Sequence, residues 1–285
     1  TTAQEAAGLA GVAARPEGNV PAPVGGSPAL TEPDRSVGQD VAALQDLLVH
    51  AAKGIAVYAH RARQAGAVSA AIDRFVVEAL FTTVTNVNFD AARMEKELRR
   101  AATLLASARD LYAGAVPKSG GQPAKLNGPT EWKAAPDRDG LVRQGETVAI
   151  TTRFSGRGTD ITGLEELLIY GLKGTAAYAQ HACELGQEDP EVYAFMHEAL
   201  ALLAAGDASV DALLCACLKC GEINLKVMAL LDAAHTGTYG HPVPTPVNIN
   251  ARKGKAILVS GHDLKDLKAL LEETEGKGIN IYTHG

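Results

Sequence analysis

The chain has 285 residues, of which 46% are hydrophobic and 21% are charged, and its formal net charge is −6. This length and hydrophobic share predict a buried core and roughly two domains. The acidic balance, the lack of a basic stripe and an aromatic share of 5% argue against nucleic-acid binding. No apolar run reaches the roughly 18 residues that cross a bilayer, and no basic segment followed by an apolar one opens the chain. We therefore expect no membrane partner and no signal peptide.

An internal repeat follows a flexible Ala/Gly/Pro-rich segment at residues 1–36. Residues 44–66 read LQDLLVHAAKGIAVYAHRARQAG, and residues 164–186 read LEELLIYGLKGTAAYAQHACELG. Identical residues recur at an offset of 120, among them the pairs Leu44/Leu164, Lys53/Lys173 and Gly54/Gly174. Such a match indicates two copies of one structural unit.

Each copy is predicted to be a three-helix bundle, at residues 37–114 and 161–233. The stripe Leu44, Leu47, Leu48, Ala51 and Ile55 has helical spacing. Gly66 and Gly186 occupy C-terminal cap positions. Second helices are expected at about 70–87 and 190–204, and third helices at about 90–112 and 209–232. The two bundles should pack together.

The remaining segments are predicted to be connections and one small α/β unit. Residues 115–160 form a Gly/Pro-rich strap in which LVRQGETVAITTRF suggests a hairpin or extended chain, and residues 234–253 form a linker loop. Residues 254–285 contain a strand (255–260), a helix (263–275) and a second strand (279–283). This pattern predicts one βαβ unit, the start of a Rossmann-like α/β domain. The fold class is therefore mainly α.

His262 is the leading candidate for chemistry, because it ends a predicted strand just before a helix. Ligands of open α/β sheets bind outside the carboxyl ends of the strands. Asp263 is the predicted helix cap, with Asp266 three residues later. A neutral imidazole there either ligates a metal or only satisfies helix-terminal groups. His284, at the end of the second strand, faces the same choice between a shared cleft and a strand-end polar role.

The other polar candidates are expected to be structural. The four cysteines are Cys183, Cys215, Cys217 and Cys220. Three of them crowd one predicted helix without a distant second pair, which favours core packing over zinc and a reducing cytoplasm over disulfides. His235 and His241 are expected to be loop residues, with a domain-junction role as the alternative. The repeated Lys-Gly pairs at 53–54 and 173–174 are expected to serve close helix packing.

Several segments together resemble a known family. HTGTYGHPVPTPV (235–247) and GKAILVSGHDLKDLKALLEETEGKGINIYTHG (254–285), with LQDLLVHAAKGIAVYA and CGEINLKVMALLD upstream, are similar to the hybrid-cluster proteins. These are also called prismane proteins or hydroxylamine reductases. The likeness covers about residues 41–285, apart from 115–160. It implies an iron–sulfur oxidoreductase with a [4Fe-4S] cubane and a hybrid iron–sulfur–oxygen cluster.

The resemblance also implies a substrate and a site. Family members reduce hydroxylamine to ammonia, are linked to nitric oxide detoxification, and take electrons from a redox donor. The histidine of SGHDL, here His262, ligates an iron of the hybrid cluster. Residues 1–43 contain no cysteine for the cubane, and the family's next ligand is a glutamate after the final THG. We therefore expect an incomplete N-terminal portion in which neither cluster is complete. It would be inactive without the remaining α/β domains or a second chain.

Two alternatives remain open at this point. The first is a non-enzymatic helical scaffold or assembly module with a vestigial site, which the cysteine-free N-terminus favours. The second is a relative of the nickel carbon monoxide dehydrogenases, whose architecture is similar to that of the hybrid-cluster family.

Overall fold

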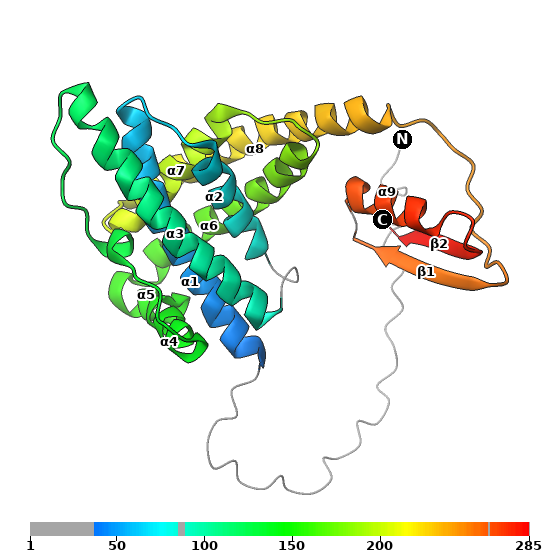
Figure 1. The fold of residues 1–285 in the computed structure, drawn as a ribbon, viewed down its shortest axis with the longest axis horizontal. Coiled ribbons are helices and arrows are strands. Elements are labelled where there is room, and N and C mark those ends of the chain that lie inside the picture. The colour runs from blue at the N-terminus through cyan, green and yellow to red at the C-terminus, as the bar shows by residue number, and fades with distance from the viewer. Residues whose placement is uncertain (1–36, 85–88, 262, 285) are drawn as a thin grey trace, which may run out of the picture. The chain divides into compact units, whose positions relative to one another are not determined.

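The computed structural model describes residues 37–84, 89–261 and 263–284 (Figure 1). The flexible segment predicted for residues 1–36 lies outside this part of the chain. The elements, in chain order, are α1 (Val37–Gln64), α2 (Ala70–Thr82), α3 (Ala91–Ala115), the 3₁₀ turns η1 (Pro117–Ser119) and η2 (Gly128–Glu131), α4 (Arg138–Val148), α5 (Ile150–Arg157), α6 (Thr159–Glu184), α7 (Pro190–Ala205), α8 (Val210–Tyr239), β1 (Lys255–Ser260), α9 (Leu264–Thr274) and β2 (Ile279–His284).

The predicted repeat is confirmed as two sets of three helices. In the first copy α1 packs on α3, and in the second α6 packs on α8. Between the copies the contacts are reciprocal, because α1 packs on α7 and α6 packs on α2. The second helix of each copy therefore packs on the first helix of the other copy. The mainly α fold class is thus confirmed.

The predicted apolar stripe of α1 forms the centre of the core. Leu44, Leu47, Leu48, Ala51 and Ile55 are each at most 1% exposed. Burying a leucine or isoleucine side chain of this kind contributes about 1.5–3 kcal/mol. Among the described helices, α1 also has the length and composition that can cross a bilayer, but 67% of that stretch is buried in the bundle. Core packing accounts for its apolar character.

The helix ends follow the predicted capping chemistry. Gly66 and Gly186 both have a φ of 81°, the left-handed conformation that glycine adopts most easily. The next amides, of Ala67 and Gln187, donate to carbonyls five residues back at 2.9 Å in both copies. Pro190 opens α7 behind the cap Asp189. In the first copy α2 ends at Thr82, earlier than the expected residue 87.

The hairpin or extended conformation predicted for residues 141–154 is wrong, because this segment lies in the helices α4 and α5. The run of β-branched residues suggested a strand, but burial follows a helical spacing. Leu141 and Val142 are buried at 0% and 2% exposed, and Gly145 joins them on the same face, four residues after Leu141. A Cβ at Gly145 would lie 2.0 Å from the Ala43 carbonyl oxygen, so α4 approaches α1 closely at this point.

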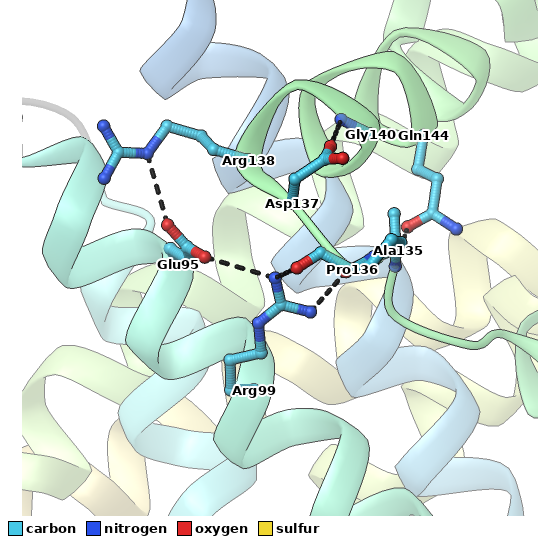
Figure 2. A network of polar contacts seen from close by, with 8 residues as sticks. All are labelled: Glu95, Arg99, Ala135, Pro136, Asp137, Arg138, Gly140 and Gln144. Carbon is cyan, nitrogen blue, oxygen red and sulfur yellow. Dashed lines mark hydrogen bonds and ion pairs between the residues drawn. The ribbon is translucent and has the colours of Figure 1, made fainter.

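A polar network holds the connection before α4 against α3 (Figure 2). Arg99 of α3 donates to the backbone carbonyls of Ala135 and Pro136. Glu95, one turn earlier, accepts from Arg99 at 3.2 Å and from Arg138 at 3.3 Å. The α4 cap, Asp137, accepts from the Gly140 amide at 2.7 Å. These bonds satisfy backbone groups that a loop would otherwise leave to water, so they fix where α4 begins.

The third helix of the second copy is longer than predicted. α8 continues to Tyr239, so His235 lies in its last turns and not in a loop. Ala234 is 2% exposed, and the Gly240 amide donates to Thr236 O at 3.0 Å. His241 lies in the exposed linker, as expected.

The predicted βαβ unit is confirmed. β1 and β2 pair in parallel, with Lys255 opposite Ile279 and Ser260 opposite His284. Among the described residues these two strands form the whole sheet. Leu258, at the centre of β1, is 73% exposed, so the sheet has an uncovered apolar face.

Candidate functional site

The strand-end site predicted from His262 is defined by its neighbours. Ser260 ends β1, Gly261 has a φ of 63°, and Asp263 caps α9 by accepting from the Asp266 amide at 2.8 Å. By register, the last residue of β2 lies beside the last residue of β1. His262, Gly285 and the side chain of His284 lie outside the described residues. Whether His262 is a metal ligand or a helix-terminal residue therefore stays a prediction.

Of the three cysteines of α8, Cys220 is buried as the packing interpretation predicts, Cys217 is half-buried, and the interpretation is wrong for exposed Cys215. Cys220 is 5% exposed, and its Sγ lies 3.8 Å from Thr175 Oγ1. The Cys217 thiol donates to Leu164 O at 3.9 Å. Burial raises the pKa of both thiols. Cys215 is exposed, and all four cysteines are free. Buried thiols with a raised pKa are poor thiolate ligands.

The described side chains do not by themselves fit an iron–sulfur cluster. Such clusters are held by several thiolates converging on one point. In the part of the chain that the structure describes, no group of three or more His, Cys, Asp or Glu residues is arranged to hold a metal ion. A cluster at His262 would need ligands beyond those described.

The repeated Lys-Gly pairs differ between the copies. A Cβ at Gly54 would lie 2.3 Å from the Pro129 carbonyl oxygen of η2, whereas nothing lies within 4 Å at Gly174. The prediction of close packing is therefore confirmed for Gly54 and wrong for Gly174. The segment between the copies covers α1 and leaves the matching face of α6 open, where Leu167 and Tyr178 are 58% and 43% exposed.

The lysines of these pairs line a cavity of about 320 Å³ between the two copies. The sequence reasoning missed this site. Its lining contains residue pairs that match at the repeat offset, namely Asp46/Glu166, Val49/Ile169, His50/Tyr170 and Lys53/Lys173. The signal available in the sequence was that a carboxylate and a lysine, seven residues apart, recur in both copies.

The charged groups of the cavity are strongly affected by burial. Lys53 is 9% exposed, and burial lowers the pKa of its ammonium to about 8, with Arg153 adding to the effect. Burial also lowers the pKa of Lys173 and raises that of Asp46. For His50, burial lowers the pKa to about 4, so its imidazole is neutral at pH 7.

A second buried histidine, His197, lies in the core near α2. It is 0% exposed, and neither ring nitrogen has a hydrogen-bond partner among the described residues. Its Nε2 lies 3.6 Å from Asp73 Oδ1, and both oxygens of Asp73 accept from Arg63 at 2.8 Å. Burial, with Arg63 adding to it, lowers the His197 pKa to about 3. Below about pH 6.5 the His197 imidazole therefore binds a proton in the unfolded chain but stays neutral in the folded chain. This histidine costs stability as the pH falls from about 6.5 towards 3.

Comparisons with known proteins identify this combination of duplicated helical bundles and a βαβ unit. The sequence model of the Prismane/CO dehydrogenase family matches residues 37–285. The hydroxylamine reductase of Rhodospirillum rubrum is 55% identical over 246 residues, which are 86% of this chain and 45% of that protein. The hydroxylamine reductase of Geobacter sulfurreducens is 48% identical over 248 residues, covering 86% and 45%. That of Burkholderia ambifaria is 47% identical over 263 residues, covering 92% and 47%.

The fold and the matched sequence define a mainly helical module that ends in a βαβ unit. The chain belongs to the Prismane/CO dehydrogenase family. It spans about half the length of the curated relatives it matches. The resemblance drawn from the C-terminal motifs is confirmed.

Proposed function

We propose that this chain is the N-terminal part of a hydroxylamine reductase. The observation that carries the proposal is the 55% identity, over 86% of the chain, to a relative named hydroxylamine reductase. The reaction takes two electrons and two protons to cleave the N–O bond of hydroxylamine, which yields ammonia and water. A redox donor protein supplies the electrons. Nitric oxide is the second nitrogenous substrate that we propose.

In this proposal the chain supplies a scaffold and one ligand. The helical copies provide a rigid base, and the βαβ unit begins the α/β domain that carries the chemistry. His262 ligates an iron of the hybrid cluster, which together with a [4Fe-4S] cubane belongs to the complete protein. The uncovered face of the sheet, where Leu258 is 73% exposed, supports further α/β structure packing there. Four free cysteines support a cytoplasmic location.

The test uses the polypeptide that continues through the C-terminal part found in the relatives, purified without oxygen. We expect it to oxidise reduced methyl viologen only when hydroxylamine is added, with ammonia as product. His262→Ala should lower iron content and activity at least about tenfold. His241→Ala, in the exposed linker, is the matched control and should change neither. A polypeptide with full iron content and no hydroxylamine-dependent oxidation would refute the proposed activity. Unchanged iron in His262→Ala would refute the ligand role.

The alternatives are less well supported. The family model joins prismane proteins with CO dehydrogenases, but the relatives compared above carry the name hydroxylamine reductase. A pure scaffold role would predict no stoichiometric iron in the extended polypeptide, so the same iron measurement separates it from the proposed enzyme.

A further inference from the structure

The cavity between the two helical copies has the form of a small-molecule site. It is formed by α1 and α6, by the corner between α4 and α5, by η2 and by the end of α7. Its volume of about 320 Å³ is at the lower end of the range of ligand pockets, about 300–1,000 Å³. It lies within the helical part of the chain and uses none of the residues of the predicted strand-end site.

Lys53 is the feature that structural packing alone does not explain. Its side chain lines the cavity and is 9% exposed. Among the described residues, no hydrogen bond or ion pair joins its ammonium to another group. Lys173, its counterpart in the second copy, donates to the Thr83 carbonyl at 3.1 Å. Burial lowers the pKa of this ammonium, and an anion bound in the cavity beside it would offset that cost.

The charges around the cavity favour an anion with a single negative charge. Arg153 pairs with Glu166 at 2.5 Å and with Glu165 at 3.8 Å, and Arg157 pairs with Glu165 at 3.3 Å. These two guanidiniums and two carboxylates balance one another. What remains is two ammonium groups, Lys53 and Lys173, facing the carboxylate of Asp46. The lining therefore keeps one uncompensated positive charge, while its carboxylates disfavour a dianion.

The rest of the lining suits the apolar part of a ligand. Between the charged groups lie aliphatic side chains of both copies and of the segment between them, namely Val49, Val148, Ile150, Ile169 and Leu203. A site with one charged anchor and an aliphatic wall discriminates against small inorganic ions, which cannot use the wall.

We propose that this cavity binds a small organic monocarboxylate, with the carboxylate on the Lys53 ammonium and the aliphatic part against the wall formed by Val49, Val148 and Ile169. Because each copy of the repeat supplies one carboxylate and one lysine, the site arises from the pairing of the copies. Neither copy forms it alone.

The test is protection of Lys53 from acylation, followed by mass spectrometry of the whole chain. At about pH 8, roughly half of the Lys53 amines are unprotonated and reactive. We expect hexanoate to slow acetylation of Lys53 several-fold, with a Kd of about 0.1–1 mM. Lys125, whose side chain is 84% exposed, is the internal control and should be unaffected. Hexylamine, of equal length and opposite charge, and inorganic phosphate should not protect.

A second measurement tests the same site by binding. Titration calorimetry should show hexanoate binding that Lys53→Met weakens at least about tenfold, whereas Lys125→Met leaves it unchanged. Circular dichroism checks that both variants are folded. The acylation experiment needs no variant, so it decides the matter even if Lys53→Met unfolds. Absence of protection at saturating hexanoate, or equal protection by hexylamine or phosphate, would overturn the proposal. Neither measurement depends on iron or on hydroxylamine reduction.

Discussion

The two repeat-equivalent glycines, Gly54 and Gly174, allow a direct measurement of how tightly the connecting segment packs. Both lie in the middle of long helices, so replacing either by alanine favours the helix by about 0.5–1 kcal/mol. At Gly54 the new Cβ would lie 2.3 Å from the Pro129 carbonyl oxygen, whereas at Gly174 it would meet nothing within 4 Å. Forcing η2 away from α1 costs about 1–3 kcal/mol, as overpacking in a core generally does.

We therefore expect Gly174→Ala to raise the free energy of unfolding by up to about 1 kcal/mol and Gly54→Ala to lower it by up to about 2 kcal/mol. Urea unfolding followed by circular dichroism at 222 nm measures both. Since the helix-propensity gain is common to the two variants, their difference isolates the clash. If Gly54→Ala stabilises the chain as much as Gly174→Ala does, the close approach of η2 to α1 is refuted.

Three further predictions concern the core, the α3–α4 connection and the thiols. The free energy of unfolding should fall between about pH 7.5 and 5.5, because the unfolded chain protonates His197. His197→Phe should make this fall about 1 kcal/mol smaller. Urea titrations at both pH values measure this, and an unchanged pH dependence would contradict the buried neutral imidazole. Arg99→Ala should lower the free energy of unfolding by about 1–3 kcal/mol and speed proteolysis near residue 135. Arg93, on the same helix, has a side chain that is 53% exposed, and Arg93→Ala should lower it by at most about 0.5 kcal/mol. Iodoacetamide should label exposed Cys215 well before buried Cys220 in mass spectra. Equal labelling rates would refute the packing of Cys220.

The elements that the sequence predicted well are those with strong local signals. The helix pairs of the repeat, the caps at Gly66 and Gly186 and the βαβ unit all depend on spacing and on glycine or aspartate at defined positions. The segment 141–154 was predicted wrongly, because its β-branched residues suggest a strand when taken alone. Its helices depend on long-range contacts, such as that of Gly145 with Ala43 and those of Arg99 with the connection before α4.

By itself, the sequence determined the duplication, the mainly α class, the family and the position of His262 in its motif. These follow from residue patterns that are local or that repeat along the chain. Only the tertiary structure decided that Gly54 is covered while Gly174 is open, and that Lys53 is buried in a cavity between the copies. The physical reason is that η2 of the connecting segment packs on α1 at Gly54, whereas no described residue packs on α6 at Gly174. Identical residues in the two copies therefore have different surroundings, and no local pattern records that difference.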